Sequence, residues 1–188
     1  MKVLETGIEG LKLVEPEAFR DGRGYFCETY SEERYAAAGM PARFVQTNES
    51  LSAKGVRRGL HWQAAPHTQA KLVRVVRGAA WDVAVDIRKG SPTYGRHFGA
   101  LLTGRNMRQL YIPRGFAHGF AALEDDTLFN YMCDNPYRRE SERGMRLDDP
   151  ALGIEWPDAG AAGAMSEKDL RLPAFDTIDP WEETEAAR

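Results

Sequence analysis

The sequence predicts an all-β protein, either a sandwich or a closed barrel, with a few short helices at its periphery. Three observations support this prediction. Short runs of β-branched and aromatic residues, broken by turn residues, recur at even spacing along the chain. Helix signals are few. With 188 residues, of which 43% are hydrophobic, the chain is long enough to bury a sizeable core.

In chain order, the first predicted element is a helix over residues 31–38, with a serine cap at its start and Gly39 after it. Residues 71–99 then carry strand-like runs separated by turn residues, which is typical of antiparallel sheet. Similar runs predict further strands at residues 98–102, 109–112, 116–123 and 127–132.

Residues 81–88, WDVAVDIR, alternate along one of these strands. The face expected to lie in the core carries Trp81, Val83, Val85 and Ile87. The opposite face, expected to be polar, carries Asp82, Ala84, Asp86 and Arg88.

The alanine- and glycine-rich residues 158–164 predict a flexible loop, and a last short helix is expected to begin at Ser166. At this length we expect one domain over residues 1–188, with a β core over about 19–157 and a C-terminal loop and short helices over 158–188.

Composition argues against several classes of protein. A net charge of −3 and a pI near 5.9 argue against a nucleic-acid partner, whose binding needs a broad basic face. No stretch approaches the roughly 20 apolar residues of a membrane span, and the first residues do not resemble a signal peptide. We therefore expect a cytoplasmic protein with no membrane partner. Cys27 and Cys133 lack metal-type spacing and are expected to be free thiols.

Residues 55–63, GVRRGLHWQ, place two arginines, a glycine and a histidine inside a strand-like segment. Arginine forks grip phosphate oxygens, while His61 titrates near neutrality and can accept a proton. The run would suit a ligand with phosphates and a carbon to deprotonate. It fits equally a basic strand with a half-buried histidine, and the segment alone leaves both interpretations open.

Residues 112–118, IPRGFAH, resemble the second half of the cupin signature, a turn that delivers a histidine into a small jelly-roll barrel. Metal-binding cupins take further ligands from a first half that this chain lacks. No two of the four histidines are spaced as a metal pair, which argues against a metal-dependent oxygenase. We expect the barrel mouth to hold an organic ligand.

Taken together, several segments resemble the dTDP-4-dehydrorhamnose 3,5-epimerase family over about residues 19–173: GVRRGLHWQ, the following Lys71, DVAVDIRKGSPTYG, IPRGFAHGF, DDPALGIEWP and SEKD. The resemblance implies a homodimeric, cupin-type jelly roll without metal or cofactor. It implies a dTDP-sugar substrate, dTDP-4-keto-6-deoxyglucose, whose carbons 3 and 5 are inverted on the way to dTDP-L-rhamnose.

The resemblance also implies catalytic roles. His61 would be the base, Lys71 would lie near the enolate oxygen, and Tyr131 would return a proton from the opposite face. Asp169 would orient His61. Each residue has a structural alternative: Asp169 could cap a helix in Ser-x-x-Asp, Lys71 could guard an edge strand, and Tyr131 could pack in the core.

The resemblance further implies a substrate-binding set. Its members are Arg23, Glu28, Gln46, Thr47, Asn48, Arg58, Lys71, His118, Glu142 and Lys168. Arg58 and Lys168 would bind the diphosphate, and the amides would suit hydroxyls or the base. The alternative for each charged member is a solvated surface charge or a surface ion pair. In the family's dimer, N-terminal strands cross the interface, so Arg23 and Glu28 could serve the partner's site.

Strand parity conflicts with this set. In a regular strand Arg57 and His61 face one way and Arg58 the other. A bulge at Gly59 would bring Arg58 and His61 together; otherwise Arg57 is the phosphate ligand.

Two alternative functions stay open on the sequence. One is a single-carbon epimerase, acting at carbon 3 or carbon 5 of a related dTDP-4-keto-6-deoxysugar. The other is a non-catalytic cupin module that binds nucleotide sugars.

Overall fold

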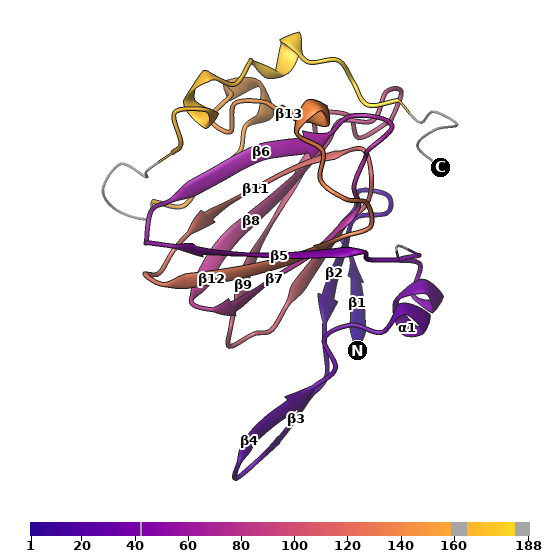
Figure 1. The fold of residues 1–188 in the computed structure, drawn as a ribbon, viewed down its shortest axis with the longest axis vertical. Coiled ribbons are helices and arrows are strands. Elements are labelled where there is room, and N and C mark those ends of the chain that lie inside the picture. Colours follow the sequence, from indigo (N-terminus) through magenta and orange to yellow (C-terminus); the bar gives the residue numbers. More distant parts are fainter. Residues whose placement is uncertain (42, 159–164, 183–188) are drawn as a thin grey trace.

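The protein is a jelly roll of two antiparallel sheets that pack face to face, with a hairpin that projects from the sandwich (Figure 1). The structure is a computed structural model and describes residues 1–41, 43–158 and 165–182. The all-β fold class expected from the sequence is confirmed. That residues 1–188 form one domain stays a prediction.

The larger sheet has the strand order β1-β2-β10-β7-β12-β5. Its strands are β1 (Lys2–Glu5), β2 (Lys12–Glu15), β5 (Gln46–Ser52), β7 (Lys71–Arg77), β10 (Gln109–Ile112) and β12 (Thr127–Cys133). β1 and β2 lie before the range 19–157 expected for the core and extend this sheet at the edge opposite β5. β7 lies between β10 and β12, so Lys71 is not on an edge strand.

The smaller sheet has the order β13-β6-β11-β8-β9. Its strands are β6 (Arg57–Gln63), β8 (Ala79–Asp86), β9 (His97–Thr103), β11 (Phe116–Ala122) and β13 (Glu142–Gly144). The strands expected at residues 98–102, 109–112, 116–123 and 127–132 are present to within a residue at each end, and β8 begins and ends two residues before the alternating run 81–88.

Three apolar clusters hold these layers together. The first lies between the sheets and includes Val73 and Leu110 from the larger sheet and Leu102 and Phe120 from the smaller. The second packs the C-terminal segment on the outer face of the smaller sheet, and the third lies under the helix α1 (Glu32–Ala37), on the outer face of the larger sheet. The helix has the expected Ser31 cap, whose side chain accepts from the Arg34 amide.

Strand β8 corrects one expectation, because both of its faces are buried. Val83 and Val85 face the second cluster, as expected of the apolar face. The face expected to be polar points into the sandwich, where Asp82 and Asp86 are 0% exposed. β8 is an interior strand covered on one side by the larger sheet and on the other by side chains from residues 145–156 and 165–181. The alternation distinguished the two faces but not which layer covers each.

A bulge in β6 sets the direction of its functional residues. His61 pairs with His118 in β11 whereas Arg58 pairs with Phe120, so three steps along β6 match two along β11. The extra residue turns Arg58 and His61 toward one cavity instead of onto opposite faces. Gly59 permits this, because its φ is +120° and a Cβ there would lie 2.5 Å from the Gly119 Cα. The bulge at Gly59, which the sequence left as one of two alternatives, is present.

The last helix expected from Ser166 is a 3₁₀ turn at Asp169–Arg171. Pro173 explains its shortness, because the residue before a proline avoids the helical region, and Leu172 is extended. Further 3₁₀ turns lie at Arg139–Ser141, Pro150–Leu152 and Phe175–Thr177. Of the loop expected over 158–164, residues 159–164 lie outside the described residues.

Candidate active site

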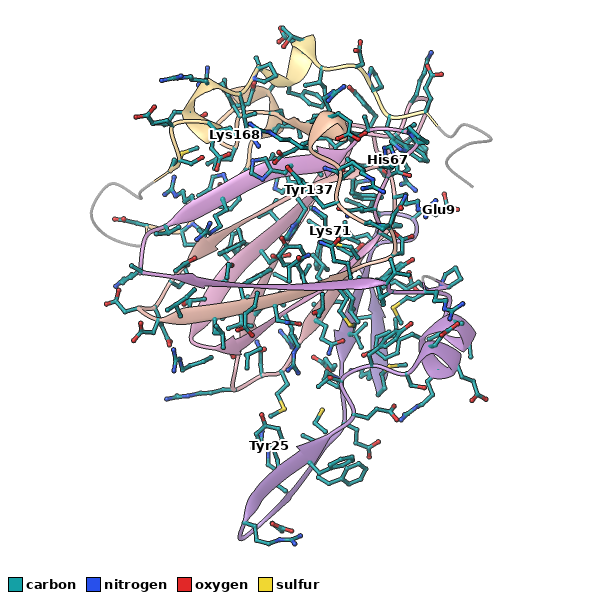
Figure 2. The ribbon with its side chains drawn as sticks, in the orientation of Figure 1. Glu9, Tyr25, His67, Lys71, Tyr137 and Lys168 are labelled. Atoms are coloured by element: carbon teal, nitrogen blue, oxygen red, sulfur yellow. The ribbon has the colours of Figure 1, made fainter. Side chains whose placement is uncertain are left out.

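Two adjoining cavities, of about 470 and 340 Å³, share three lining residues: His61, Lys71 and Tyr131. His61 comes from the smaller sheet and the other two from the larger sheet, so the site lies inside the sandwich. Figure 2 shows Lys71 between β6 and β5. The larger cavity also holds Arg58, His118, Lys168 and Asp169, and the smaller one holds Gln46, Asn48 and Glu142.

His61 is bonded to a buried carboxylate. Its Nε2 lies 2.7 Å from Oδ1 of Asp169, whose side chain is 5% exposed. Burial acts to raise the pKa of Asp169, but hydrogen bonds from His61, from Ser166 and from the Gly59 amide outweigh it and hold the pKa below its ordinary value. The carboxylate therefore stays ionised at neutral pH and stabilises a protonated ring.

The capping alternative for Asp169 is met by a different group. The Ser166 hydroxyl accepts from the Asp169 backbone N–H at 3.0 Å, which leaves the Asp169 carboxylate available to His61. Ser166 thus caps the backbone amide, and the Asp169 carboxylate pairs with His61.

Lys71 faces the junction of the two cavities and has no hydrogen bond or ion pair with any residue that the structure describes. Burial lowers the pKa of Lys71, while Cys133, Asp82 and Glu142 act to raise it. An amine in this setting is available to a ligand, because no protein group competes for it.

Tyr131 packs its ring against the cluster between the sheets and lines both cavities, so the core-packing alternative and the functional one both describe it. Burial raises the pKa of Tyr131, with a smaller contribution from Cys133, and Arg58 opposes it. The hydroxyl is therefore protonated at neutral pH and able to donate.

A second histidine–carboxylate pair lies at the larger cavity. The Nε2 of His118 lies 2.8 Å from Oδ2 of Asp82, and both side chains are buried. His118 and His61 are cross-strand neighbours in β11 and β6, so the two histidines lie side by side in the smaller sheet.

Glu142, in the smaller cavity, bonds to Tyr137 of the same cavity and to Lys168 of the larger one. Its Oε2 accepts from the Tyr137 hydroxyl at 2.8 Å and pairs with Lys168 Nζ at 2.5 Å. Burial acts to raise the pKa of Glu142, but Lys168 and Tyr137 outweigh it and lower the pKa. Gln46 Nε2 donates to the Asn48 Oδ1 at 2.9 Å in the same cavity.

Arg57 and Arg58 both line the larger cavity. Arg58 Nε donates to Ser52 Oγ at 3.3 Å, and Arg57 Nε is buried without a partner among the described residues. Because of the bulge, strand alternation no longer places Arg57 and Arg58 on opposite faces, and both can reach a ligand in this cavity.

Three expected substrate contacts do not line either cavity of this chain. Arg23 is on the projecting hairpin, bonded to Asp21 and with its side chain 91% exposed, and Glu28 pairs with Arg34. Thr47 is exposed, because it alternates with its neighbours along β5 and faces away from the cavity that Gln46 and Asn48 line.

Asp82 and Tyr137, which bond to residues of the site, were absent from the expected set. Asp82 carried a usable signal, since a carboxylate between tryptophan and valine in a strand-like run needs a partner. Tyr137 carried none, because it lies in an irregular segment with no periodicity.

Within residues 1–41, 43–158 and 165–182, no group of three or more His, Cys, Asp or Glu side chains is placed to hold a metal ion. In the same ranges, no helix is long and apolar enough to cross a membrane. The cytoplasmic location stays a prediction. Cys27 and Cys133 are free, as expected.

Comparison with known proteins assigns the chain to a family. The model of the dTDP-4-dehydrorhamnose 3,5-epimerase family matches residues 5–177. The chain belongs to the dTDP-4-dehydrorhamnose 3,5-epimerase family. A curated family relative from Shigella flexneri is 45% identical over 180 residues, which cover 95% of this chain and 98% of the relative.

Solved structures of this family superpose closely on the fold. One is the dTDP-6-deoxy-D-glucose-3,5-epimerase of Legionella pneumophila in complex with dTDP-4-keto-L-rhamnose, at a TM-score of 0.92 and 44% identity, covering 97% of this chain and 99% of that one. Another is a 3′-monoepimerase from Streptomyces bikiniensis in complex with dTDP-quinovose, at a TM-score of 0.85 and 34% identity, covering 91% and 86%.

Proposed function

We propose that the protein inverts carbons 3 and 5 of dTDP-4-dehydro-6-deoxy-D-glucose to give dTDP-4-dehydro-L-rhamnose, in dTDP-L-rhamnose biosynthesis. The observation that carries this proposal is the junction of the two cavities, where His61, Lys71 and Tyr131 converge and His61 is held by Asp169. A base, a cation and an acid are the three groups that epimerisation next to a ketone requires.

Proton transfer in this mechanism balances as follows. His61 takes a proton from carbon 3 or carbon 5, and the electron pair of the broken C–H bond moves into the ketone, which becomes an enolate. The Lys71 ammonium stabilises the charge on the enolate oxygen. Tyr131 donates a proton to the opposite face of the same carbon and becomes a phenolate. Exchange with solvent then removes the proton from His61 and returns one to Tyr131 before the second carbon reacts.

A nucleotide sugar would span both cavities, with its ketone at their junction. Arg58 and Lys168 would bind the diphosphate, with Arg57 lining the same cavity. The amides of Gln46 and Asn48 would suit hydroxyls or the base. Binding a phosphate at Lys168 would exchange its present partner, Glu142, for the ligand.

We further propose a homodimer in which hairpin β3–β4, formed by Ala18–Asp21 and Gly24–Cys27, lies against the partner. The hairpin projects from the sandwich (Figure 1) and exposes Phe19 by 60%, Tyr25 by 58% and Phe26 by 70%. A lone two-stranded hairpin is marginally stable, and such an apolar surface favours contact with protein. Arg23 and Glu28 would then reach the partner's site.

Deuterium incorporation tests the reaction. The protein is incubated with dTDP-4-keto-6-deoxyglucose in deuterated water, and NMR locates the label. Label at both carbons 3 and 5 is expected. Label at one carbon only would support a single-carbon epimerase. This alternative is tested because the chain is also similar to a 3′-monoepimerase. Binding of dTDP without any label would indicate a non-catalytic module.

The mechanism uses side chains for every step, so we propose that it needs neither metal nor cofactor. Activity is expected to persist after dialysis against EDTA. Its loss, with recovery on adding back one divalent metal, would contradict this.

A further inference from the structure

Asp82 is the buried carboxylate that the mechanism above does not use. It is 0% exposed, in an interior strand, and its side chain bonds only to His118 among the described residues. Its second oxygen, Oδ1, is buried without a partner in the same part of the chain. Burying a carboxylate so sparsely bonded is unfavourable, so stability alone does not explain the residue.

Asp86, four residues along the same strand, provides the contrast. It is equally buried, but its two oxygens accept from Arg88, Ser91 and Thr93, which fixes the turn between β8 and β9. Asp86 lines neither of the two cavities. The hydrogen bonds of Asp86 all serve the turn, whereas the one hydrogen-bond partner of the Asp82 side chain among the described residues belongs to the active site.

The pairing matches the one at the catalytic base. In both pairs the histidine uses Nε2, at 2.7 Å from Asp169 in one and 2.8 Å from Asp82 in the other. A histidine whose Nε2–H donates to a carboxylate keeps its other nitrogen, Nδ1, for a second partner. Nδ1 of His118 makes no hydrogen bond with a described residue, and it is not one of the buried atoms that lack one, so it reaches the cavity that His118 lines.

We propose that Asp82 is a positioning residue that holds a proton on Nε2 of His118 and so turns Nδ1 of that ring toward the substrate. This rests on the proposed function, since it assigns Asp82 a part in the same reaction. Asp82 itself does not contact the substrate. Its role is to fix the tautomer and orientation of a ring that does.

The test compares Asp82→Asn with Asp86→Asn as a matched control. Both substitutions remove a buried charge from β8, and both are expected to change the midpoint of thermal unfolding. With dTDP-4-keto-6-deoxyglucose, kcat of Asp82→Asn falls about 100-fold, the lower end of what a positioned acid–base side chain contributes, because the tautomer of His118 is no longer fixed by a carboxylate. The affinity of both variants for dTDP stays close to that of the unaltered protein. The kcat of Asp86→Asn also stays close to the unaltered value. Equal kcat values for the two variants would overturn the proposal.

A double variant tests the route of the effect. If Asp82 acts through His118, His118→Asn and the double variant with Asp82→Asn have equal kcat values. A further loss in the double variant would mean that Asp82 acts on another group, and the proposal would fail.

The tautomer is measured directly, which keeps the proposal testable where Asp82→Asn does not fold. In protein labelled with ¹⁵N-histidine, the His118 signals are assigned by their loss in His118→Asn. A proton on Nε2 is expected, and a bare Nε2 would overturn the proposal. An unaltered protein that binds dTDP but shows no turnover would instead reject the proposed function, whatever the tautomer.

Discussion

At the scale of single residues, the site works through pairs. In the proposed reaction, His61 is an effective base because Asp169 is both buried and well bonded, so the carboxylate stays charged beside the ring. Lys71, unlike His61, has no hydrogen-bond or ion-pair partner among the described residues. In the proposed reaction it is therefore free to stabilise the charge that appears on the enolate oxygen only during the reaction.

His61→Asn should remove turnover while leaving binding intact. Loss of a positioned general base lowers kcat by about 10²–10⁴-fold, whereas Asn retains a polar side chain of similar size. Steady-state kinetics and calorimetric titration with dTDP check the two parts. His97→Asn, in β9 and outside both cavities, should leave kcat unchanged. A His61→Asn protein with near-normal kcat would contradict the assignment of the base.

Sequence reasoning at this scale found most of the site and missed residues for physical reasons. His61, Lys71, Tyr131 and Asp169 converge as expected. Thr47 was grouped with its neighbours although a strand cannot aim three consecutive side chains at one cavity. Asp82 was seen only as part of a polar face, because a pattern of alternation does not reveal the partner strand opposite it.

At the scale of elements, the bulge in β6 positions residues of the site, whereas the turn after β8 stabilises the fold and lies outside both cavities. The bulge depends on backbone space that only glycine leaves. The turn depends on Asp86, which ties Arg88, Ser91 and Thr93 together. The helix expected from Ser166 failed at this scale because Pro173 acts on the residues before it.

Gly59→Ala should disrupt the bulge. A Cβ would lie 2.5 Å from the backbone of Gly119, which cannot give way as a flexible side chain could, and the residue would be held at a φ of +120°. We expect a loss of about 1–3 kcal/mol in unfolding free energy, together with loss of turnover. Gly90→Ala is the control, since its φ is also positive, at +73°, but nothing lies within 4 Å. Denaturant unfolding that gave equal losses for both would contradict the steric argument.

Asp86→Asn should destabilise the protein in a pH-dependent way. Burial acts to raise the pKa of Asp86, but its hydrogen bonds outweigh this and lower it from 3.8 to about 2. A depressed pKa adds stability above pH 3.8 that is lost as the pH falls through 2, and the shift corresponds to about 2 kcal/mol. Unfolding of both proteins across this range should show the difference narrowing below pH 4. A constant difference would contradict it.

At the scale of the whole molecule, the hairpin β3–β4 stands apart from the sandwich that contains the site. In the proposed dimer, the partner chain covers the exposed aromatic residues of the hairpin. Arg23 and Glu28 then reach the partner's site. Residue patterns predicted the sandwich well, because its strands alternate or run apolar. They could not place the hairpin, whose surroundings in the proposed dimer include a second chain.

Phe26→Ser should weaken the dimer, because Phe26 is 70% exposed on the hairpin and would be covered in the assembly. Sedimentation velocity at several concentrations should show a dimer for the unaltered protein and more monomer for the variant. Leu101→Ser is the control, because Leu101 is 43% exposed in β9, on the main sandwich. A monomeric unaltered protein, or equal behaviour of the two variants, would contradict the proposed interface.

The bulge in β6 also has a consequence for mutational scanning. The backbone amide of Gly59, at the bulge, helps to lower the pKa of Asp169, and Asp169 in turn holds His61. A main-chain amide survives every side-chain substitution, so an alanine scan cannot register this contact. Replacing the amide with an ester by chemical protein synthesis would remove the bond alone. A complete inventory of sensitive side chains would therefore still omit one support of the catalytic base.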